Sequence, residues 1–470
     1  MTQPQTLGEL RASGWESVPV KDEIRRNAMQ RIAAGEALFE GVMGYEDSVV
    51  PQLECALLAG HDVVFLGERG QAKTRMIRSV TNLLDEWMPI VEGSEINDDP
   101  YNPISRHAKD VVAEHGDDTP VAWVHRDARF SEKLATPDTA IADLIGEVDP
   151  IKVAEGRYLS DELTLHYGLV PRTNRGIFAI NELPDLAERI QVGLLNVLEE
   201  RDVQVRGYKV RLPLDLMLFA SANPEDYTNR GRIITPLKDR FGSQIRTHYP
   251  REIDLEMDIV EQEAELVSSD AMTVDVPDFM AEVVVTMTHL ARQSPHVNQR
   301  SGVSVRLSIA NYETLVASAV RRTLKQGGAA AVPRIADLES LMGSTMGKIE
   351  IDSLDDGRDA EIIDHLQKAA VLGVFKDSID PALVGRILDA FDGETTVNAG
   401  SDIPDAEYVA VLEKVPGIRD AVLALGFEES ELSDAPLVAS AVEFILEGLH
   451  LSKRLNKDAA RTGAIYRGRQ

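Results

Sequence analysis

The stretch Asp62-Val-Val-Phe-Leu-Gly-Glu-Arg-Gly-Gln-Ala-Lys-Thr74 decides the fold of this chain. Its apolar first half ends in glycine, a pattern typical of a buried strand that leads into a turn. The octet Gly67–Thr74 matches the phosphate-loop template G-x-x-x-x-G-K-[ST] except at the second glycine, where Ala72 stands. Such a turn points backbone N–H groups inward, and the following helix adds partial positive charge. We expect Lys73 to reach the β- and γ-phosphates of a nucleotide and Thr74 to offer its hydroxyl to Mg²⁺.

Ala72 departs from the glycine of the template, and its side chain could carry a steric cost. One extra methyl at Ala72 is a small steric burden if its φ is negative. Read alone, the octet also suits an ordinary strand-to-helix turn that happens to contain Lys-Thr.

Two further polar clusters follow apolar strands. Ile177-Phe-Ala-Ile-Asn181-Glu182 ends in an amide and a carboxylate, and Phe219-Ala-Ser-Ala-Asn223-Pro224 ends in an amide. Ligands of open parallel sheets bind at the carboxyl ends of the strands, so these side chains should meet the loop there. Glu182 suits the residue that polarises an attacking water, and Asn223 suits one that orients this water. Asn181 stands where an aspartate is expected, and it lacks the charge that favours a dication.

The order of patterns predicts an α/β fold with a parallel sheet. Apolar strands alternate with helical stripes, such as the one between Leu186 and Glu200. Expected strands are 62–66, 121–125, 177–180, 214–221 and 244–249. After Arg251 the strand signals stop and helices follow. We interpret Glu95–Asp118 as a mobile surface insertion and the last twenty residues as a solvated helix end.

Composition narrows the function classes. The 470 residues carry 49 Lys and Arg against 78 Asp and Glu, a net charge of −29, which argues against a broad nucleic-acid surface. No apolar run approaches the roughly 20 residues of a membrane-spanning helix, and we see no secretion signal. The one cysteine, Cys55, suits a reducing cytoplasm. The histidines show no metal-binding spacing, and we assign no transition metal.

Taken together, the motifs resemble the AAA+ ATPase superfamily, and most closely the clade of magnesium chelatase I subunits and MoxR-type ATPases. The resemblance covers roughly residues 37–325. The segments that carry it are Met43–Tyr45, Gly67–Thr74, Gly146–Pro150, Leu169–Ile177, Ile190–Leu198, Ala220–Pro224 and Leu237–Gly242.

The resemblance implies ATP and Mg²⁺ as cofactors and assigns roles to residues. The implied catalytic residues are Lys73, Glu182, Asn223 and Arg240, the last as an arginine finger that reaches into a neighbouring subunit. Thr74 and Asn181 would hold Mg²⁺, through water. The residues implied to contact nucleotide are Gly44, Tyr45, Gly67, Glu68, Arg69, Gly70, Gln71, Ala72, Lys73, Thr74, Arg75 and Arg306. Tyr45 would touch adenine and Arg306 the γ-phosphate. The roles of Arg172 and Arg175 stay open.

The resemblance also implies an assembly, and together with the sequence patterns it gives a domain order. The order is an N-terminal arm (1–36), an α/β nucleotide-binding core (37–252), a helical lid (253–330) and a mostly helical C-terminal domain (331–470). A β-hairpin over 202–213 and an inserted segment over 136–169 fit the clade. Its members form homo-oligomeric rings, here expected to be a hexamer, that work on a partner carrying a von Willebrand A domain. Metal insertion into a porphyrin is one branch only, and nothing in the sequence indicates it.

Two alternatives remain open. Asn181 favours a nucleotide-dependent regulatory or assembly module that hydrolyses poorly. A DNA-acting AAA+ protein is disfavoured by the charge of −29 and by the lack of an obvious basic helix-turn-helix.

Overall fold

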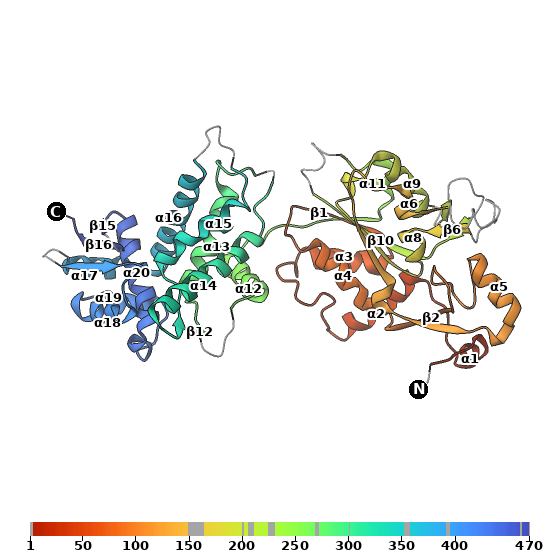
Figure 1. The fold of residues 1–470 in the computed structure, drawn as a ribbon, viewed down its shortest axis with the longest axis horizontal. Coiled ribbons are helices and arrows are strands. Elements are labelled where there is room, and N and C mark those ends of the chain that lie inside the picture. Colours follow the sequence, from red (N-terminus) through yellow and green to blue (C-terminus); the bar gives the residue numbers. More distant parts are fainter. Residues whose placement is uncertain are drawn as a thin grey trace. The chain divides into compact units, whose positions relative to one another are not determined.

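The chain folds into two compact units, Met1–His248 and Tyr249–Gln470 (Figure 1). The structure is a computed structural model. It describes residues 3–148, 164–199, 202–204, 211–223, 231–267, 272–299, 301–351, 358–391, 395–460 and 463–469.

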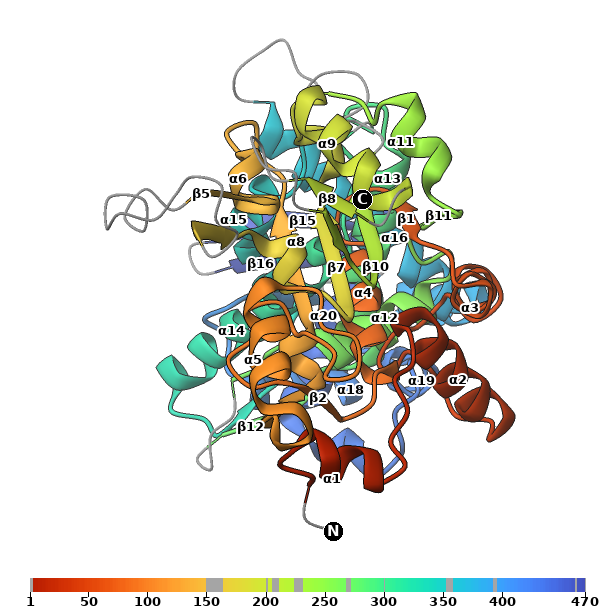
Figure 2. The same cartoon turned by 90° about the vertical axis from the view of Figure 1, so that its right-hand side faces the viewer.

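A five-stranded parallel sheet organises the first unit. In chain order its strands are β1 (Val63–Leu66), β4 (Phe130–Leu134), β7 (Gly176–Asn181), β10 (Leu216–Ala222) and β11 (Ser243–Arg246). In space their order is β11-β1-β10-β7-β4, so the strand that precedes the phosphate loop is flanked by the last two strands in sequence. Every pairing in this sheet is parallel, and the predicted α/β class is therefore confirmed. Figure 2 shows β1, β7 and β10 from the side of this unit.

Alternate residues of the strands enter two different cores. Val64 of β1 and Phe178 of β7 face α9 and α11, whereas Val63 and Phe65 face α2, α3 and α4. This period of two is expected of strands buried on both faces, and it explains why these strands are apolar throughout. The helices of this unit are α1 (Leu7–Ala12), α2 (Val20–Ala33), α3 (Val49–Ala59), α4 (Lys73–Ser79), α5 (Arg106–His115), α6 (Ile141–Leu144), α8 (Leu169–Arg172), α9 (Glu188–Glu199) and α11 (Thr235–Arg240).

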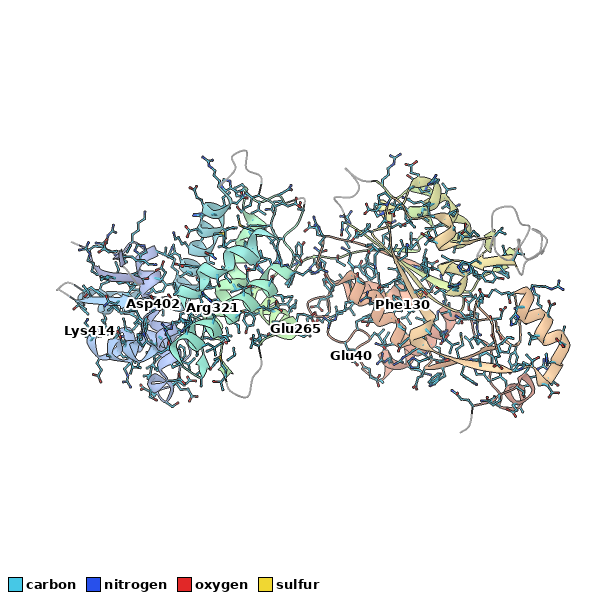
Figure 3. The ribbon with its side chains drawn as sticks, viewed as in Figure 1. Glu40, Phe130, Glu265, Arg321, Asp402 and Lys414 are labelled. Atoms are coloured by element: carbon cyan, nitrogen blue, oxygen red, sulfur yellow. The ribbon has the colours of Figure 1, made fainter. Side chains whose placement is uncertain are left out.

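The second strand of the sheet is not the predicted one. Val121–His125 forms a strand, β3, but it pairs antiparallel with β2 (Trp87–Val91) in a separate ribbon. The edge of the main sheet is instead β4, whose sequence Phe-Ser-Glu-Lys-Leu is polar. Of these residues, Phe130 packs against the core, and it is labelled in Figure 3. An edge strand needs no continuous apolar run, so the hydrophobic pattern does not reveal it.

The segment 95–118 is not the mobile insertion that its composition suggests. It contains α5, and Asp98 within it is fully buried. The Asp98 carboxylate accepts hydrogen bonds from the backbone N–H groups of Ile104 and Ser105 and from the hydroxyls of Ser94 and Ser105. One buried carboxylate thus orders an acidic, proline-containing segment.

Three short antiparallel pairings complete the first unit. β2 pairs with β3, β5 (Gly146–Val148) with β6 (Leu165–Tyr167), and β8 (Asp202–Gln204) with β9 (Arg211–Pro213). The strands of the predicted hairpin over 202–213 are therefore present. Residues 205–210 of that hairpin and 149–163 of the predicted inserted segment lie outside the described residues.

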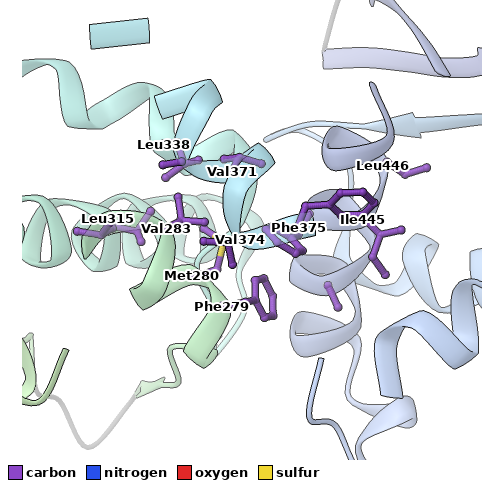
Figure 4. Packing of buried hydrophobic residues seen from close by; sticks show 14 of the residues in the cluster. Phe279, Met280, Val283, Leu315, Leu338, Val371, Val374, Phe375, Ile445 and Leu446 are labelled. Carbon is purple, nitrogen blue, oxygen red and sulfur yellow. The ribbon is translucent and has the colours of Figure 1, made fainter. Parts of the chain in front are cut away.

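The second unit is mostly helical around one core. Its helices are α12 (Ile253–Glu263), α13 (Asp278–Gln293), α14 (Arg306–Gln326), α15 (Leu341–Met346), α16 (Asp359–Ser378), α17 (Pro381–Asp389), α18 (Asp405–Lys414), α19 (Ile418–Ala424) and α20 (Ala435–Leu451). Phe279 of α13 and Phe375 of α16 both pack on Phe444 of α20, at ring-centroid distances of 4.7 and 6.2 Å. Figure 4 shows Phe279 and Phe375 within this core. The segments 253–330 and 331–470 share this single cluster.

The C-terminal tail is not a helix end. β15 (Leu455–Ala460) and β16 (Gly463–Gly468) pair antiparallel, and β14 (Thr396–Ala399) joins the other edge of β16. Tyr466 of β16 is buried, and its hydroxyl donates to Glu447 of α20. Basic residues on the exposed positions of these strands conceal the strand pattern. A two-residue parallel pairing, β12 (Thr273–Val274) with β13 (Ala330–Ala331), lies elsewhere in this unit. Among the helices described, none is long and apolar enough to cross a membrane.

Candidate functional site

The predicted phosphate loop connects β1 to α4. Helix α4 begins at Lys73, and the residue that caps it, Ala72, has a φ of 53°. The condition under which the alanine would cost little, a negative φ, is therefore not met. A left-handed backbone costs an alanine about 1–2 kcal/mol. Gly70, with a φ of 72°, takes the other left-handed position without such a cost.

Gly67 is required by close packing. A Cβ built on it would lie 1.9 Å from Thr247 Oγ1 and 2.3 Å from Gln71 Oε1. These two atoms are themselves hydrogen-bonded at 2.6 Å, with the Thr247 hydroxyl as donor. Thr247 follows β11, the strand beside β1, and its backbone N–H donates to Leu66 O. It is a loop contact that sequence reasoning missed, because a single threonine after a strand carries no signal.

Tyr45 supports the loop from the other side. Its buried hydroxyl lies within hydrogen-bond distance of Gln71 O, at 3.0 Å, and of His248 O, at 2.8 Å. Burial raises the pKa of Tyr45, so the phenol stays protonated and remains a donor. Gly44 beside it has a φ of 81°. The sequence placed Gly44 and Tyr45 near adenine. The geometry adds a second role for Tyr45, as a brace of the loop backbone.

Lys73, Asn223 and Glu182 form a continuous hydrogen-bonded chain. Lys73 Nζ donates to Asn223 Oδ1 at 2.9 Å, and Asn223 Nδ2 donates to Glu182 Oε2 at 2.7 Å. Lys73 also donates to the carbonyl oxygens of Gly67 and Glu68 at 2.5 and 2.6 Å. Three residues predicted from three separate motifs are thus brought together at the carboxyl edge of the sheet.

The end of β7 has an unusual local structure. Asn181 is its last residue, and its Oδ1 accepts from the Ser221 hydroxyl at 3.3 Å. The same hydroxyl oxygen accepts from the backbone N–H of Glu182, also at 3.3 Å. Glu182 itself has a φ of 55°, a left-handed conformation that costs a non-glycine residue about 1–3 kcal/mol and clusters at functional sites. Ser221 lies within the motif that the sequence singled out, but no role was predicted for it.

The remaining predicted nucleotide contacts are distributed unevenly. Thr74 is half-buried at the start of α4, and both Arg69, within the loop, and Arg75, in α4, are exposed. Arg240 ends α11 and donates to Pro236 O at 3.3 Å. Arg306 is the first residue of α14 in the second unit and is exposed.

The two arginines without a predicted role lie away from this edge. Arg175 precedes β7, at the opposite end of the strand from Asn181. It is buried, donates to Pro89 O and stacks near Trp15, and its burial lowers its pKa. Arg172 is exposed at the end of α8. The structure therefore gives Arg175 a packing role at the amino-terminal edge of the sheet.

The donor set fits a triphosphate and offers Mg²⁺ mainly neutral oxygens. The loop supplies backbone N–H groups, an ammonium and a helix start, which are the usual phosphate ligands. For Mg²⁺, the predicted ligands are the Thr74 hydroxyl and the Asn181 amide oxygen, with Glu182 as the nearby carboxylate. Within the described part of the chain, no group of three or more His, Cys, Asp or Glu side chains is arranged to hold a metal ion.

Sequence comparison shows which known proteins this chain resembles. No protein-family model matches the chain. It is 28% identical over 214 residues to the magnesium-chelatase subunit ChlI of Anabaena variabilis, a match that covers 43% of this chain and 57% of that protein. It is 30% identical over 211 residues to ChlI of Guillardia theta (43% and 55% covered), and 29% identical over 208 residues to the chloroplastic ChlI-1 of Arabidopsis thaliana (43% and 45% covered). The chain spans about half the length of the curated relatives that it matches.

Solved structures give weaker likenesses. A complex of the BchI and BchD subunits of magnesium chelatase is 20% identical, with 69% of this chain and 98% of that chain covered and a TM-score of 0.35. NtrX from Brucella abortus is 16% identical, with 76% and 69% covered and a TM-score of 0.39. The assignment therefore depends on the sequence relatives and on the sheet itself. Together they confirm the resemblance to AAA+ ATPases of the magnesium chelatase I subunit and MoxR type.

Proposed function

We propose that this protein binds and hydrolyses ATP as an AAA+ ring ATPase. The observation that carries the proposal is the Lys73–Asn223–Glu182 chain at the carboxyl edge of the parallel sheet. A phosphate-binding lysine, a water-orienting amide and a carboxylate in mutual contact are the groups that hydrolysis of a phosphoanhydride needs.

Each side chain in this hydrogen-bonded chain has one proposed task. Lys73 exchanges its contacts with the carbonyls of Gly67 and Glu68 for phosphate oxygens. Glu182 accepts a hydrogen bond from an attacking water and polarises it, while Asn223 holds the carboxylate in place. Bound Mg²⁺ would neutralise charge on the phosphates. Thr74 is the residue proposed to hold it, with Asn181 as a weaker, neutral contact through water.

Assembly completes the site in this proposal. Arg240 stabilises transition-state charge in the neighbouring subunit, and Arg306 matches the lid arginine that contacts the γ-phosphate. Both roles require the predicted division into a core (37–252), a lid (253–330) and a C-terminal domain (331–470), and a closed ring, which we propose to be a hexamer.

We propose that the ring remodels a client together with a von Willebrand A-domain protein in the cytoplasm. The support is the resemblance of the motifs to MoxR-type ATPases, and the single, exposed Cys55 suits a reducing compartment. Metal loading of the client would follow from the chelatase relatives. Chelatase activity itself has no support from the residues of this chain.

A second candidate is a nucleotide-dependent regulatory or assembly module that hydrolyses slowly. The observation that favours it is Asn181, which replaces the aspartate expected at the strand end and whose oxygen is hydrogen-bonded to Ser221.

Steady-state ATP hydrolysis separates the two candidates. The ring ATPase requires measurable turnover at saturating Mg·ATP in the wild type, and loss of turnover with retained ATP binding in Glu182→Gln. Absence of wild-type turnover, with turnover appearing in Asn181→Asp, would contradict the ring ATPase and support the regulatory module.

A further inference from the structure

We propose that this site binds ATP almost equally well with and without Mg²⁺, because Ser221 fixes the amide of Asn181 so that the strand end contributes little to holding the metal. The inference rests on the proposed nucleotide site and specifies its metal requirement. It makes Ser221 a positioning residue that acts through Asn181.

The Ser221 hydroxyl lies at the carboxyl end of β10. Ser221 is the second-last residue of this strand and is only 2% exposed. Its oxygen accepts from the backbone N–H of Glu182, and its proton is directed to Asn181 Oδ1. The serine therefore holds the Glu182 backbone and the Asn181 amide together as one unit.

The hydrogen bond to Ser221 limits what the Asn181 side chain can offer to a metal ion or to its bound water. The Ser221 hydroxyl occupies one of the two lone pairs of Asn181 Oδ1, and the other end of the amide is an NH₂ group, which is a donor only. A water molecule bound to a cation directs its protons outward, so the NH₂ group cannot accept a hydrogen bond from that water. Mg²⁺ in nucleotide sites is commonly bound through one or two carboxylates together with the phosphates.

The neighbouring carboxylate is also hydrogen-bonded. Glu182 accepts from Asn223 Nδ2, and Asn223 also accepts from the Lys73 ammonium. The negative charge of Glu182 is thus already partnered through Asn223 with a positive charge. The phosphates and the Thr74 hydroxyl remain as the main ligands, and the phosphates bind Mg²⁺ equally well in solution.

Because metal binding and nucleotide binding are linked, the contribution of the site to metal binding can be measured as a ratio of two dissociation constants. The Kd for ATP in EDTA divided by the Kd for Mg·ATP equals the factor by which the site holds the metal more tightly than free ATP does. For the wild type we expect this ratio to lie within about threefold of one.

The experiment is calorimetric titration of the 470-residue protein with ATP, in EDTA and in excess Mg²⁺. Asn181→Asp supplies the missing charge and should raise the ratio by about tenfold or more, both by attracting the metal and by repelling bare phosphate. Ser221→Ala releases the amide oxygen and should raise the ratio by about threefold. Asn398→Asp, which adds the same charge at an exposed position of β14, should leave the ratio unchanged.

Each outcome decides the inference. A wild-type ratio above about tenfold, or a ratio that Asn181→Asp does not change, would overturn it while leaving nucleotide binding itself established. Absence of ATP binding in both buffers would overturn the proposed function and this inference together. Thermal unfolding of each variant verifies its fold, and if Ser221→Ala does not fold, the Asn181→Asp comparison decides alone.

Discussion

Two residues of the candidate site, one in the phosphate loop and one after β7, carry conformational costs. Ala72 and Glu182 both adopt left-handed backbone conformations that favour glycine, and both lie where phosphate and water are proposed to bind. Such conformations persist when the surrounding contacts fix them, here the contacts of Tyr45, Thr247 and Asn223.

Replacing Ala72 with glycine should relieve that cost. Because the native φ is 53°, we expect Ala72→Gly to leave the free energy of unfolding unchanged or to raise it by up to about 1 kcal/mol. The matched control is Ala113→Gly, at an exposed position within α5, which should destabilise by about 1 kcal/mol. Denaturant unfolding measures both. Equal losses in the two variants would contradict the left-handed conformation at Ala72.

Adding a methyl at Gly67 should disrupt the loop. A Cβ there would lie 1.9 Å from Thr247 Oγ1, so Thr247 and Gln71 must move and their hydrogen bond must break. We expect Gly67→Ala to weaken ATP binding about tenfold or more. Gly343→Ala, where an added Cβ meets nothing within 4 Å, is the control and should bind as the wild type does. ATP binding by Gly67→Ala at wild-type affinity would show that the loop tolerates the shift.

Among the elements, the hydrophobic pattern predicted the three central strands and the edge strand β11, but it missed the other edge strand, β4. β1, β7 and β10 were predicted because their residues are apolar on both faces, and the motifs that end them were therefore placed correctly. β4 and the β15–β16 hairpin were missed because polar and basic residues occupy their exposed positions. Ser221 and Thr247 could not be predicted as site residues, since their roles depend on strands that are neighbours only in space.

Three helices of the second unit, α12, α13 and α14, are joined by one buried carboxylate. Glu256 of α12 is fully buried and accepts from His289 and Arg292 of α13 and from Ser308 of α14. Burial acts to raise the pKa of Glu256, but these hydrogen bonds and the charge of Arg292 outweigh it and hold the pKa below its ordinary value of 4.5.

This carboxylate should make the second unit acid-sensitive. A pKa that is lower in the folded state stabilises fully above the ordinary value of 4.5, and that stability is lost as pH falls through the folded pKa. We expect Glu256→Gln to destabilise by about 3 kcal/mol at pH 7 and by less at pH 3.5. The exposed Glu261→Gln on the same helix should change stability by less than about 0.5 kcal/mol. A Glu256→Gln loss independent of pH, in urea unfolding, would contradict the ionised carboxylate.

At the scale of the whole molecule, the proposal requires a neighbouring subunit. If Arg240 acts in trans, Arg240→Ala should lower ATP turnover by about 10³-fold with unchanged ATP binding. Mixing Arg240→Ala with Lys73→Ala subunits should restore part of the turnover, because some interfaces then pair an intact lysine with an intact arginine. The control is Arg232→Ala, at an exposed residue that precedes α11 in the sequence, and its turnover should match that of the wild type. Equal loss of binding and turnover in Arg240→Ala would make this arginine structural.

The charge of −29 gains a clearer meaning at this scale. The basic residues proposed to matter converge on one polyphosphate, and the acidic excess is left to other surfaces. The sequence could predict this concentration of function in residues 37–325. The mostly helical character of residues 331–470 was also predicted, but their three-stranded sheet was not, because it carries no motif.

A nucleotide site at this edge of the sheet is tested most directly by ATP binding to the wild type and to Lys73→Ala, measured by calorimetry on the 470-residue proteins. We expect saturable wild-type binding that Lys73→Ala weakens by about tenfold or more, since the ammonium is proposed to contact the phosphates directly. The exposed Lys368→Ala on α16 should bind as the wild type does. Equal ATP affinity in Lys73→Ala and the wild type, or no binding in either, would contradict a nucleotide site at this edge of the sheet.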